Sequence, residues 1–115
     1  MDERRKLKRK YLIFYTRVFD VATGNLLGHL VDITPAGAML ISEHTLPVGN
    51  DFRLRMELSP EVARQADIEF DARSVWCKQD VNPQFYNTGF RLAAMTPESE
   101  AIVKRIVEVY GFRDN

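Results

Sequence analysis

Two short segments carry residue types that could bind a polar or anionic ligand. The first is the stretch Asp32-Ile-Thr-Pro-Ala-Gly37, where a carboxylate, a hydroxyl, a rigid corner and a residue without a side chain lie within six positions. The second is the N-terminal segment 2–10, DERRKLKRK, which holds six basic residues against two acidic ones. Guanidinium groups donate several hydrogen bonds from a planar fork, whereas carboxylates only accept them. The two segments therefore supply complementary hydrogen-bonding chemistry.

Catalytic and metal-binding patterns are poorly represented. His29 and His44 are the only histidines, and neither lies at metal-ligand spacing from a carboxylate or cysteine. Cys77, the single cysteine, is expected to pack in a strand beside Trp76. The sequence contains no Gly-rich phosphate loop, and its scattered carboxylates form no evident acid–base pair. We therefore expect a protein that is not an enzyme, with no catalytic residues, metal ion or cofactor.

The charge distribution separates the N-terminal segment from the rest of the chain. The 115 residues include 16 basic and 16 acidic side chains, but residues 1–10 hold six of the basic ones and only two of the acidic ones. The remaining chain, with ten basic and fourteen acidic residues, is mildly anionic. This division favours an anion-binding arm and argues against a basic groove for long nucleic acid.

Length and composition indicate a single domain without a membrane span. A chain of 115 residues is long enough for one hydrophobic core. No apolar run approaches the roughly 20 residues that span a bilayer, and the charged N-terminus does not resemble a secretory signal peptide. A lone cysteine fits a reducing compartment. These features predict a cytoplasmic protein.

Apolar patterning predicts a mainly β domain. Six strands are expected, near residues 11–19, 26–33, 38–42, 52–58, 68–78 and 85–92. Phe52–Leu58 alternates cleanly between apolar and charged side chains, as a half-buried strand does. In the fifth strand Trp76 is in phase with Phe70, which predicts that both side chains face the same side. Residues 59–66 are expected to form a short helical turn or a loop.

The C-terminal segment has helical periodicity. Thr96 is a suitable N-cap, Pro97 suits the first helical position, and apolar residues then recur at helical spacing until Gly111. We expect a helix over about 97–110 that covers a six-stranded antiparallel barrel. The domain organisation is then a flexible basic arm, residues 1–10, followed by a single barrel domain, residues 11–115.

The two polar segments together resemble the motifs of the PilZ domain family. That family carries Arg-x-x-x-Arg near the N-terminus and Asp/Asn-x-Ser-x-x-Gly after the first hairpin, and this chain has Arg5-x-x-x-Arg9 and Asp32-x-Thr34-x-x-Gly37. The stretch 72–76, ARSVW, and the pair Gly89-Phe90 also match features of the family. Thr34 departs from the usual serine but retains the hydroxyl. The resemblance covers nearly the whole chain and implies a six-stranded barrel that binds cyclic di-GMP.

The chemistry of the motif residues suits that ligand. Arg5 and Arg9 would meet the guanine O6 and N7 atoms or the phosphates, because a guanidinium fork binds two neighbouring acceptors at once. Asp32 would accept from the opposite guanine edge, and Thr34 and Gly37 would approach a base or phosphate closely. In this family the residue corresponding to Arg4 influences whether one ligand molecule or a stacked pair is bound.

These features predict a stand-alone receptor or adaptor that binds cyclic di-GMP and signals by ordering its N-terminal arm. It would act on a downstream protein that the sequence does not identify. Two alternatives remain at this point. One is a PilZ-like protein-interaction domain without nucleotide binding. The other is a small barrel that binds single-stranded nucleic acid through the arm, with strong salt dependence and indifference to guanine.

Overall fold

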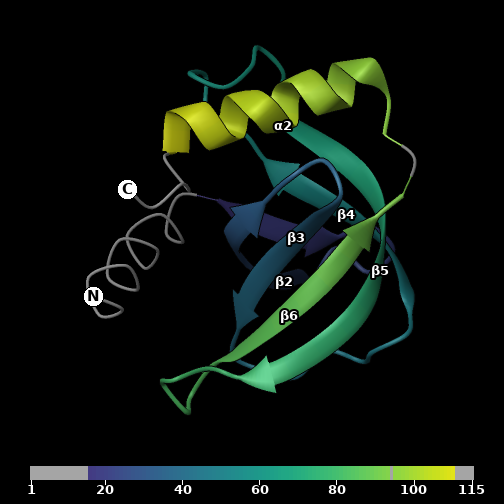
Figure 1. Cartoon of the computed structure of the whole chain (residues 1–115), viewed down its shortest axis with the longest axis vertical. Helices are drawn as coiled ribbons and strands as arrows, with labels where there is room; N and C mark the ends of the chain where they lie inside the picture. Colours follow the sequence, from purple (N-terminus) through teal and green to yellow (C-terminus); the bar gives the residue numbers. More distant parts are fainter. Residues whose placement is uncertain (1–15, 94, 111–115) are drawn as a thin grey trace.

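The computed structural model describes residues 16–93 and 95–110. Its strands are β1 (Arg17–Asp20), β2 (Leu26–Ile33), β3 (Gly37–Ser42), β4 (Asp51–Glu57), β5 (Asp67–Gln79) and β6 (Tyr86–Leu92). All pairs are antiparallel, in the order β1-β2-β3-β6-β5-β4, and β1 also pairs with β4, so the sheet closes into a barrel (Figure 1). The predicted six-stranded antiparallel barrel is confirmed. The N-terminal part of the first predicted strand, residues 11–15, lies outside the described residues.

The barrel interior is filled by one side of each strand. In β4 the inward residues Leu54 and Met56 are fully buried, while Arg53 is exposed and the intervening Arg55 is half-buried. This alternation follows from the two-residue period of a strand, which the sequence pattern displayed. The other largely buried core residues include Val18, Leu30, Ile33, Leu40, Ile68, Phe70, Phe90 and Leu92.

The predicted loops take their expected forms. Between β1 and β2, Asp20 O accepts a hydrogen bond from Gly24 N at 2.7 Å, and Gly24 adopts φ +77°, which favours a residue without a side chain. Between β4 and β5, Ser59 O accepts from Val62 N at 3.0 Å and Ala63 N at 3.3 Å, which closes one short turn.

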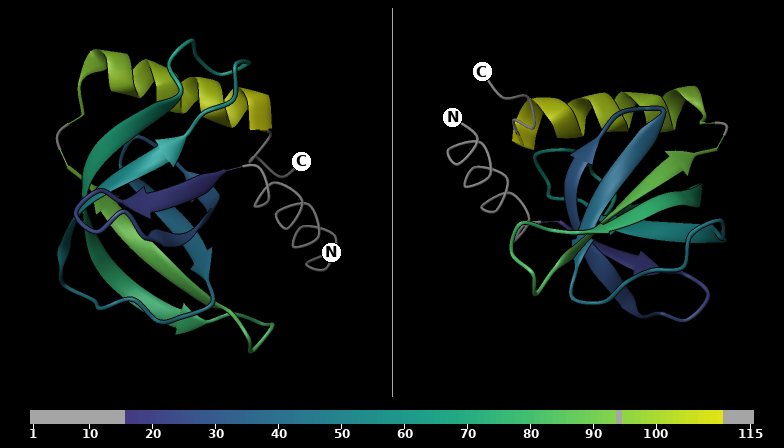
Figure 2. Two further views of the ribbon diagram at one scale, coloured as in Figure 1. Left: turned by 180° about the vertical axis from the view of Figure 1, so that it is seen from behind. Right: turned by 60° about the horizontal axis from the view of Figure 1, so that its bottom comes forward.

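The C-terminal helix α2 (Pro97–Tyr110) closes one end of the barrel. Figures 1 and 2 show it lying across the barrel end, with the β5–β6 hairpin extending away from it on the opposite side. Thr96 Oγ1 accepts a hydrogen bond from Ser99 N at 3.1 Å, as expected of an N-cap. Val103 and Ile106 are fully buried and join the barrel core. Among the described residues, no helix combines the length and apolar character that crossing a bilayer requires.

The prediction for Trp76 was wrong. The register between β5 and β6 shifts between Ser74 and Trp76, so the strand carries a bulge there. Ser74 remains buried, and its hydroxyl donates to Pro47 O at 2.6 Å. Trp76 instead pairs with Gly89 on the outer face of the barrel and is 36% exposed. Because a bulge reverses the face of every later residue in a strand, alternation alone could not place this side chain.

The Trp76 ring lies directly against the backbone of Gly89. A Cβ atom added at Gly89 would lie 2.2 Å from Trp76 Nε1 and 2.3 Å from Trp76 Cε2. Real atoms do not approach so closely, so the ring can hold this position only while residue 89 lacks a side chain.

Gly89→Ala therefore tests the position of the ring. We expect the ring to be displaced into solvent, with a red shift of the intrinsic emission of this single tryptophan and a loss of about 1–3 kcal/mol of stability. Fluorescence spectra and urea denaturation measure the two effects. Ala22→Gly, a change of the same size in an exposed turn, is the control. An unchanged emission spectrum in Gly89→Ala would contradict the placement.

Candidate functional site

The turn between β2 and β3 is held by a dense set of local hydrogen bonds. Thr34 N donates to Gly37 O at 2.8 Å, and Gly37 N donates to Thr34 O at 3.3 Å. Thr34 Oγ1 also accepts from Ala36 N and Gly37 N, each at 3.2 Å. Since the oxygen is used as an acceptor, the hydroxyl proton can be donated to a ligand. The threonine thus both shapes the turn and presents a donor.

A further bond attaches this turn to the last strand. Leu92 N donates to Ala36 O at 2.9 Å, so the tip of the turn is tied to the end of β6. Gly37 reinforces the attachment, because a Cβ atom there would lie 2.8 Å from Phe90 O. Gly37 does not adopt a positive φ, so the close approach of β3 to β6 is the reason that the structure gives for glycine at this position.

Asp32 occupies the outer face of β2, directly opposite Met39 on β3. It is half-buried, and its Oδ1 accepts a hydrogen bond from Ile33 N at 2.9 Å. A carboxylate can accept about four hydrogen bonds, so this contact orients the group without exhausting it. The arrangement points to recognition of a ligand that carries N–H donors.

These residues border a shallow pocket of about 250 Å³ on the outer face of the barrel. Asp32, Thr34 and Gly37 form one side, and Trp76 and Gly89 belong to the opposite side. Lys78 Nζ lies 5.8 Å from the centroid of the Trp76 ring. The pocket therefore combines hydrogen-bonding groups with an aromatic surface, a combination that suits a purine base. Its other lining residues include Ile33, Ala38, Met39, Val75 and Phe90.

Sequence reasoning identified the polar side of this pocket and missed the apolar side. Trp76 and Met39 were not predicted as site residues, because the bulge in β5 and the pairing of β3 with β6 bring them there. The adjacent pair Val75-Trp76 was one available signal, since two large apolar residues in succession do not fit a strand that alternates.

The chain enters the barrel beside this pocket. Thr16 O accepts a hydrogen bond from Leu30 N at 3.1 Å, which places the start of the described chain two residues from Asp32 along β2. Arg4, Arg5 and Arg9 lie outside the described residues. Arg9 precedes Thr16 by seven residues, a separation that an extended chain spans with at most roughly 25 Å. The described chain therefore begins close to the predicted turn.

A second hollow lies on the other side of the same turn. It has a volume of about 580 Å³ and lies between Asp32–Pro35 and the helix α2, where Val103, Lys104, Val107 and Glu108 line it. The turn thus separates the pocket containing Trp76 from a groove beside the C-terminal helix.

The arginines on the β1, β4 and β5 strands are paired with carboxylates. Arg17 makes a bidentate contact with Glu57 at 2.8 and 3.0 Å, and this contact raises the pKa of Arg17. Arg53 bridges two carboxylates, with Glu69 at 3.1 Å and Asp71 at 2.9 Å. Similar contacts join Arg55 to Asp67 and Arg73 to Asp51. This neutralised surface does not offer a basic track for a polyanion.

The histidines and the cysteine lie away from this pocket. His29 and His44 line a different cavity, and burial together with the charge of Arg17 lowers the pKa of His29. Cys77 Sγ accepts a hydrogen bond from Thr88 Oγ1 at 3.4 Å, in keeping with a packing role. Within residues 16–93 and 95–110, no group of three histidine, cysteine or acidic side chains is placed to hold a metal ion.

Comparison with known proteins places this geometry in a family. The PilZ domain model matches residues 3–109. The fold is similar to the PilZ domain of YcgR from Escherichia coli, whose structure was solved with cyclic di-GMP: 18% identity, a TM-score of 0.63, and coverage of 84% of this chain and 81% of that one. It is also similar to the inhibitor of motility MotI/DgrA from Bacillus subtilis: 12% identity, a TM-score of 0.62, and coverage of 87% of this chain and 48% of that one. No curated protein matches the sequence. Because the family match extends over nearly the whole chain, this protein belongs to the PilZ domain family.

Proposed function

We propose that this PilZ domain is a receptor for cyclic di-GMP. The observation that carries the proposal is the position of the turn: Asp32 and Thr34 border a pocket with an aromatic wall, and Thr16, where the described chain begins, bonds to Leu30, two residues from Asp32 along β2. A guanine nucleotide needs hydrogen-bond acceptors for its N1–H edge, cationic groups for its phosphates and an apolar surface for its ring. In the proposed site Asp32 provides the acceptors, the N-terminal arm provides the cationic groups, and Trp76 provides the apolar surface.

In the proposed complex the turn between β2 and β3 contacts the ligand from the barrel, and the N-terminal arm contacts it from the other side. Asp32 accepts from the guanine N1–H and exocyclic amine, while Thr34 donates its hydroxyl proton to a phosphate oxygen. Arg5 and Arg9 reach the ligand from the arm, where a guanidinium fork binds the O6 and N7 edge or a phosphate. Arg4 lies beside this pair and influences whether one ligand molecule or a stacked pair is held. The Trp76 ring contributes base stacking worth about 1–3 kcal/mol.

Signalling would follow from ordering of the arm. The polar, aperiodic segment 2–10 has little apolar surface to offset the entropy of ordering by itself, and bound ligand supplies the missing interactions. An ordered arm changes the surface that the barrel shows to a downstream protein. The function is therefore binding and relay, without catalysis or a cofactor. Because cyclic di-GMP is an intracellular messenger of bacteria, the proposed receptor acts in the cytoplasm.

Calorimetric titration with cyclic di-GMP tests both the identity of the ligand and the proposed roles of Arg5, Arg9 and Asp32. Arg5→Gln, Arg9→Gln and Asp32→Asn should each weaken cyclic di-GMP binding by about 5- to 150-fold, because each loses a bidentate or complementary contact worth about 1–3 kcal/mol. Lys10→Gln removes the same single charge from the same arm and should change the affinity by less than about threefold.

The same titration separates the proposal from its alternatives. A linear guanine dinucleotide should bind more weakly than the cyclic one. A domain that acts only through protein contacts would show no heat with cyclic di-GMP. A single-stranded nucleic acid binder would lose similar affinity in Arg5→Gln and Lys10→Gln, because its contacts depend on the number of charges.

Hydrogen exchange tests the proposed ordering of the arm. Amides of residues 2–10 should exchange more slowly when cyclic di-GMP is saturating, because binding fixes the segment across the ligand. Amides of β4, residues 51–57, serve as the internal control and should exchange at the same rate in both states. Binding accompanied by equal exchange of residues 2–10 in both states would leave the receptor role intact and overturn the arm mechanism.

A further inference from the structure

A further cavity lies at the opposite end of β2 and β3 from the turn that joins them, residues 33–37, which we call the motif turn. It has a volume of about 510 Å³, within the range of sites that hold small molecules or side-chain anchors. Its sides are Leu26–His29 of β2 and Ile41–His44, which comprise the end of β3 and the two residues after it. Asn82 and Phe85 from the β5–β6 hairpin complete the lining. Among the described residues, it shares no lining residue with the pocket containing Trp76.

The position of this cavity follows from the way the two strands approach each other. A Cβ atom at Gly28 would lie 2.4 Å from Ile41 O, so β2 and β3 are in close contact there. The pairing of β2 with β3 begins one residue later, at His29 and Ile41, and Leu26–Gly28 have no register partner on β3. At the end of β3, Ser42 Oγ donates a hydrogen bond to His44 O at 2.7 Å, which fixes the backbone that follows the strand. The walls of the cavity are therefore preformed.

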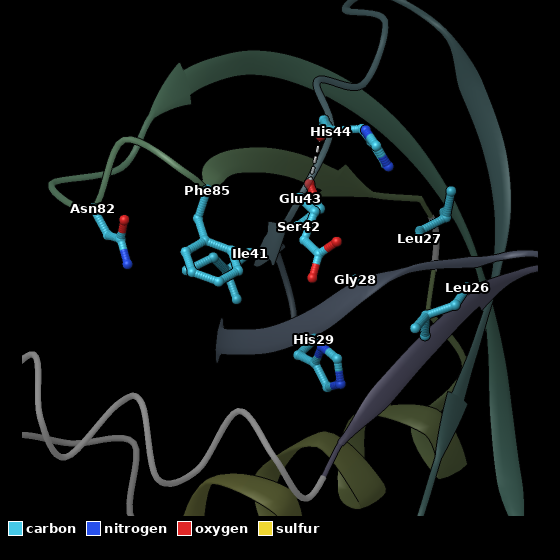
Figure 3. A pocket seen from close by; sticks show the side chains of 10 residues that line it. All are labelled: Leu26, Leu27, Gly28, His29, Ile41, Ser42, Glu43, His44, Asn82 and Phe85. Atoms are coloured by element: carbon cyan, nitrogen blue, oxygen red, sulfur yellow. Dashed lines mark hydrogen bonds between the residues drawn. The ribbon is translucent and has the colours of Figure 1, made fainter.

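The cavity combines two apolar walls with a carboxylate between them. Figure 3 shows Ile41 and Phe85 on one side, Leu26 and Leu27 on the other, and the carboxylate of Glu43 between the two. Leu26 is 48% exposed, a high value for a leucine in a strand. An apolar surface of this kind, next to a charged group, is typical of a site that binds a partner.

The charges around the cavity favour a cation. Glu43 is exposed and contributes a negative charge to the lining. Burial and the nearby Arg17 lower the pKa of His29 by more than the charge of Glu43 raises it, which favours the neutral imidazole. Arg17 itself is held by Glu57 in a bidentate contact and does not neutralise Glu43 directly. A positively charged group flanked by apolar groups matches this distribution, whereas an anion would be repelled.

We propose that this cavity is a docking site for a basic–apolar segment of a partner protein, in which an Arg or Lys side chain pairs with Glu43 and flanking aliphatic side chains pack on the Leu26–Leu27 and Ile41–Phe85 walls. The site lies outside the nucleotide pocket, and its occupation does not require cyclic di-GMP. Because β2 and β3 extend from this cavity to Asp32 and Gly37, a partner docked here contacts the same two strands that form the nucleotide site.

NMR titration of the isotope-labelled full chain tests this site directly. The probe is acetyl-Leu-Arg-Leu amide, and its counterpart with citrulline in place of arginine has the same shape without the charge. The arginine peptide should shift amide signals of residues 26–29, 41–44 and 82–85. Glu43→Gln should weaken its binding by about two- to fivefold and leave binding of the citrulline peptide unchanged.

Controls separate this proposal from the nucleotide receptor function. Glu61→Gln, at another exposed carboxylate, should not change peptide binding, and Glu43→Gln should not change the affinity for cyclic di-GMP. Equal binding of the arginine and citrulline peptides, or the absence of shifts at the cavity, would overturn the proposal. So would binding of 4-phenylbutylamine that equals or exceeds that of the arginine peptide, because the cavity would then be a site for free amphipathic amines.

Discussion

The attachment of the motif turn to the barrel is the constraint on which the site depends. The reciprocal bonds between Thr34 and Gly37 close the turn, and the bond from Leu92 N to Ala36 O joins it to the last strand. Gly37 permits β3 to lie against the carbonyl of Phe90. As a result, the carboxylate and the hydroxyl of the motif are fixed relative to the barrel wall before any ligand arrives, so less entropy is lost on binding.

The positive charge available to the pocket is distributed unevenly between the barrel and the N-terminal segment. The barrel arginines of β1, β4 and β5 are paired with carboxylates on their own surface, whereas the cationic residues of the N-terminal segment are concentrated in ten positions. A fixed acceptor surface and a separate source of positive charge are complementary parts of the proposed nucleotide site.

Most of the fold was predictable because its local signals agree with each other. The clean alternation of β4, the glycine-containing turn before β2 and the Thr96 cap each specify a local structure that the barrel retains. The polar half of the candidate site was predictable for a similar reason, since Asp32 and Thr34 belong to one short motif. Trp76 was not predictable from alternation, because an added residue in β5 reversed its face. The cavity at Glu43 also escaped prediction, since its walls come from three separate segments.

Closure of the barrel has a consequence for how such a domain can assemble with other chains. Six strands paired in a ring give every strand of the described chain a partner on both sides. Adding a strand from a neighbouring molecule, the usual route to edge-to-edge aggregation, would require breaking an existing ladder. Small domains at high cellular concentration benefit from this protection. Association through side-chain surfaces avoids this cost, and the specificity of such surfaces can change by substitution without altering the main-chain framework.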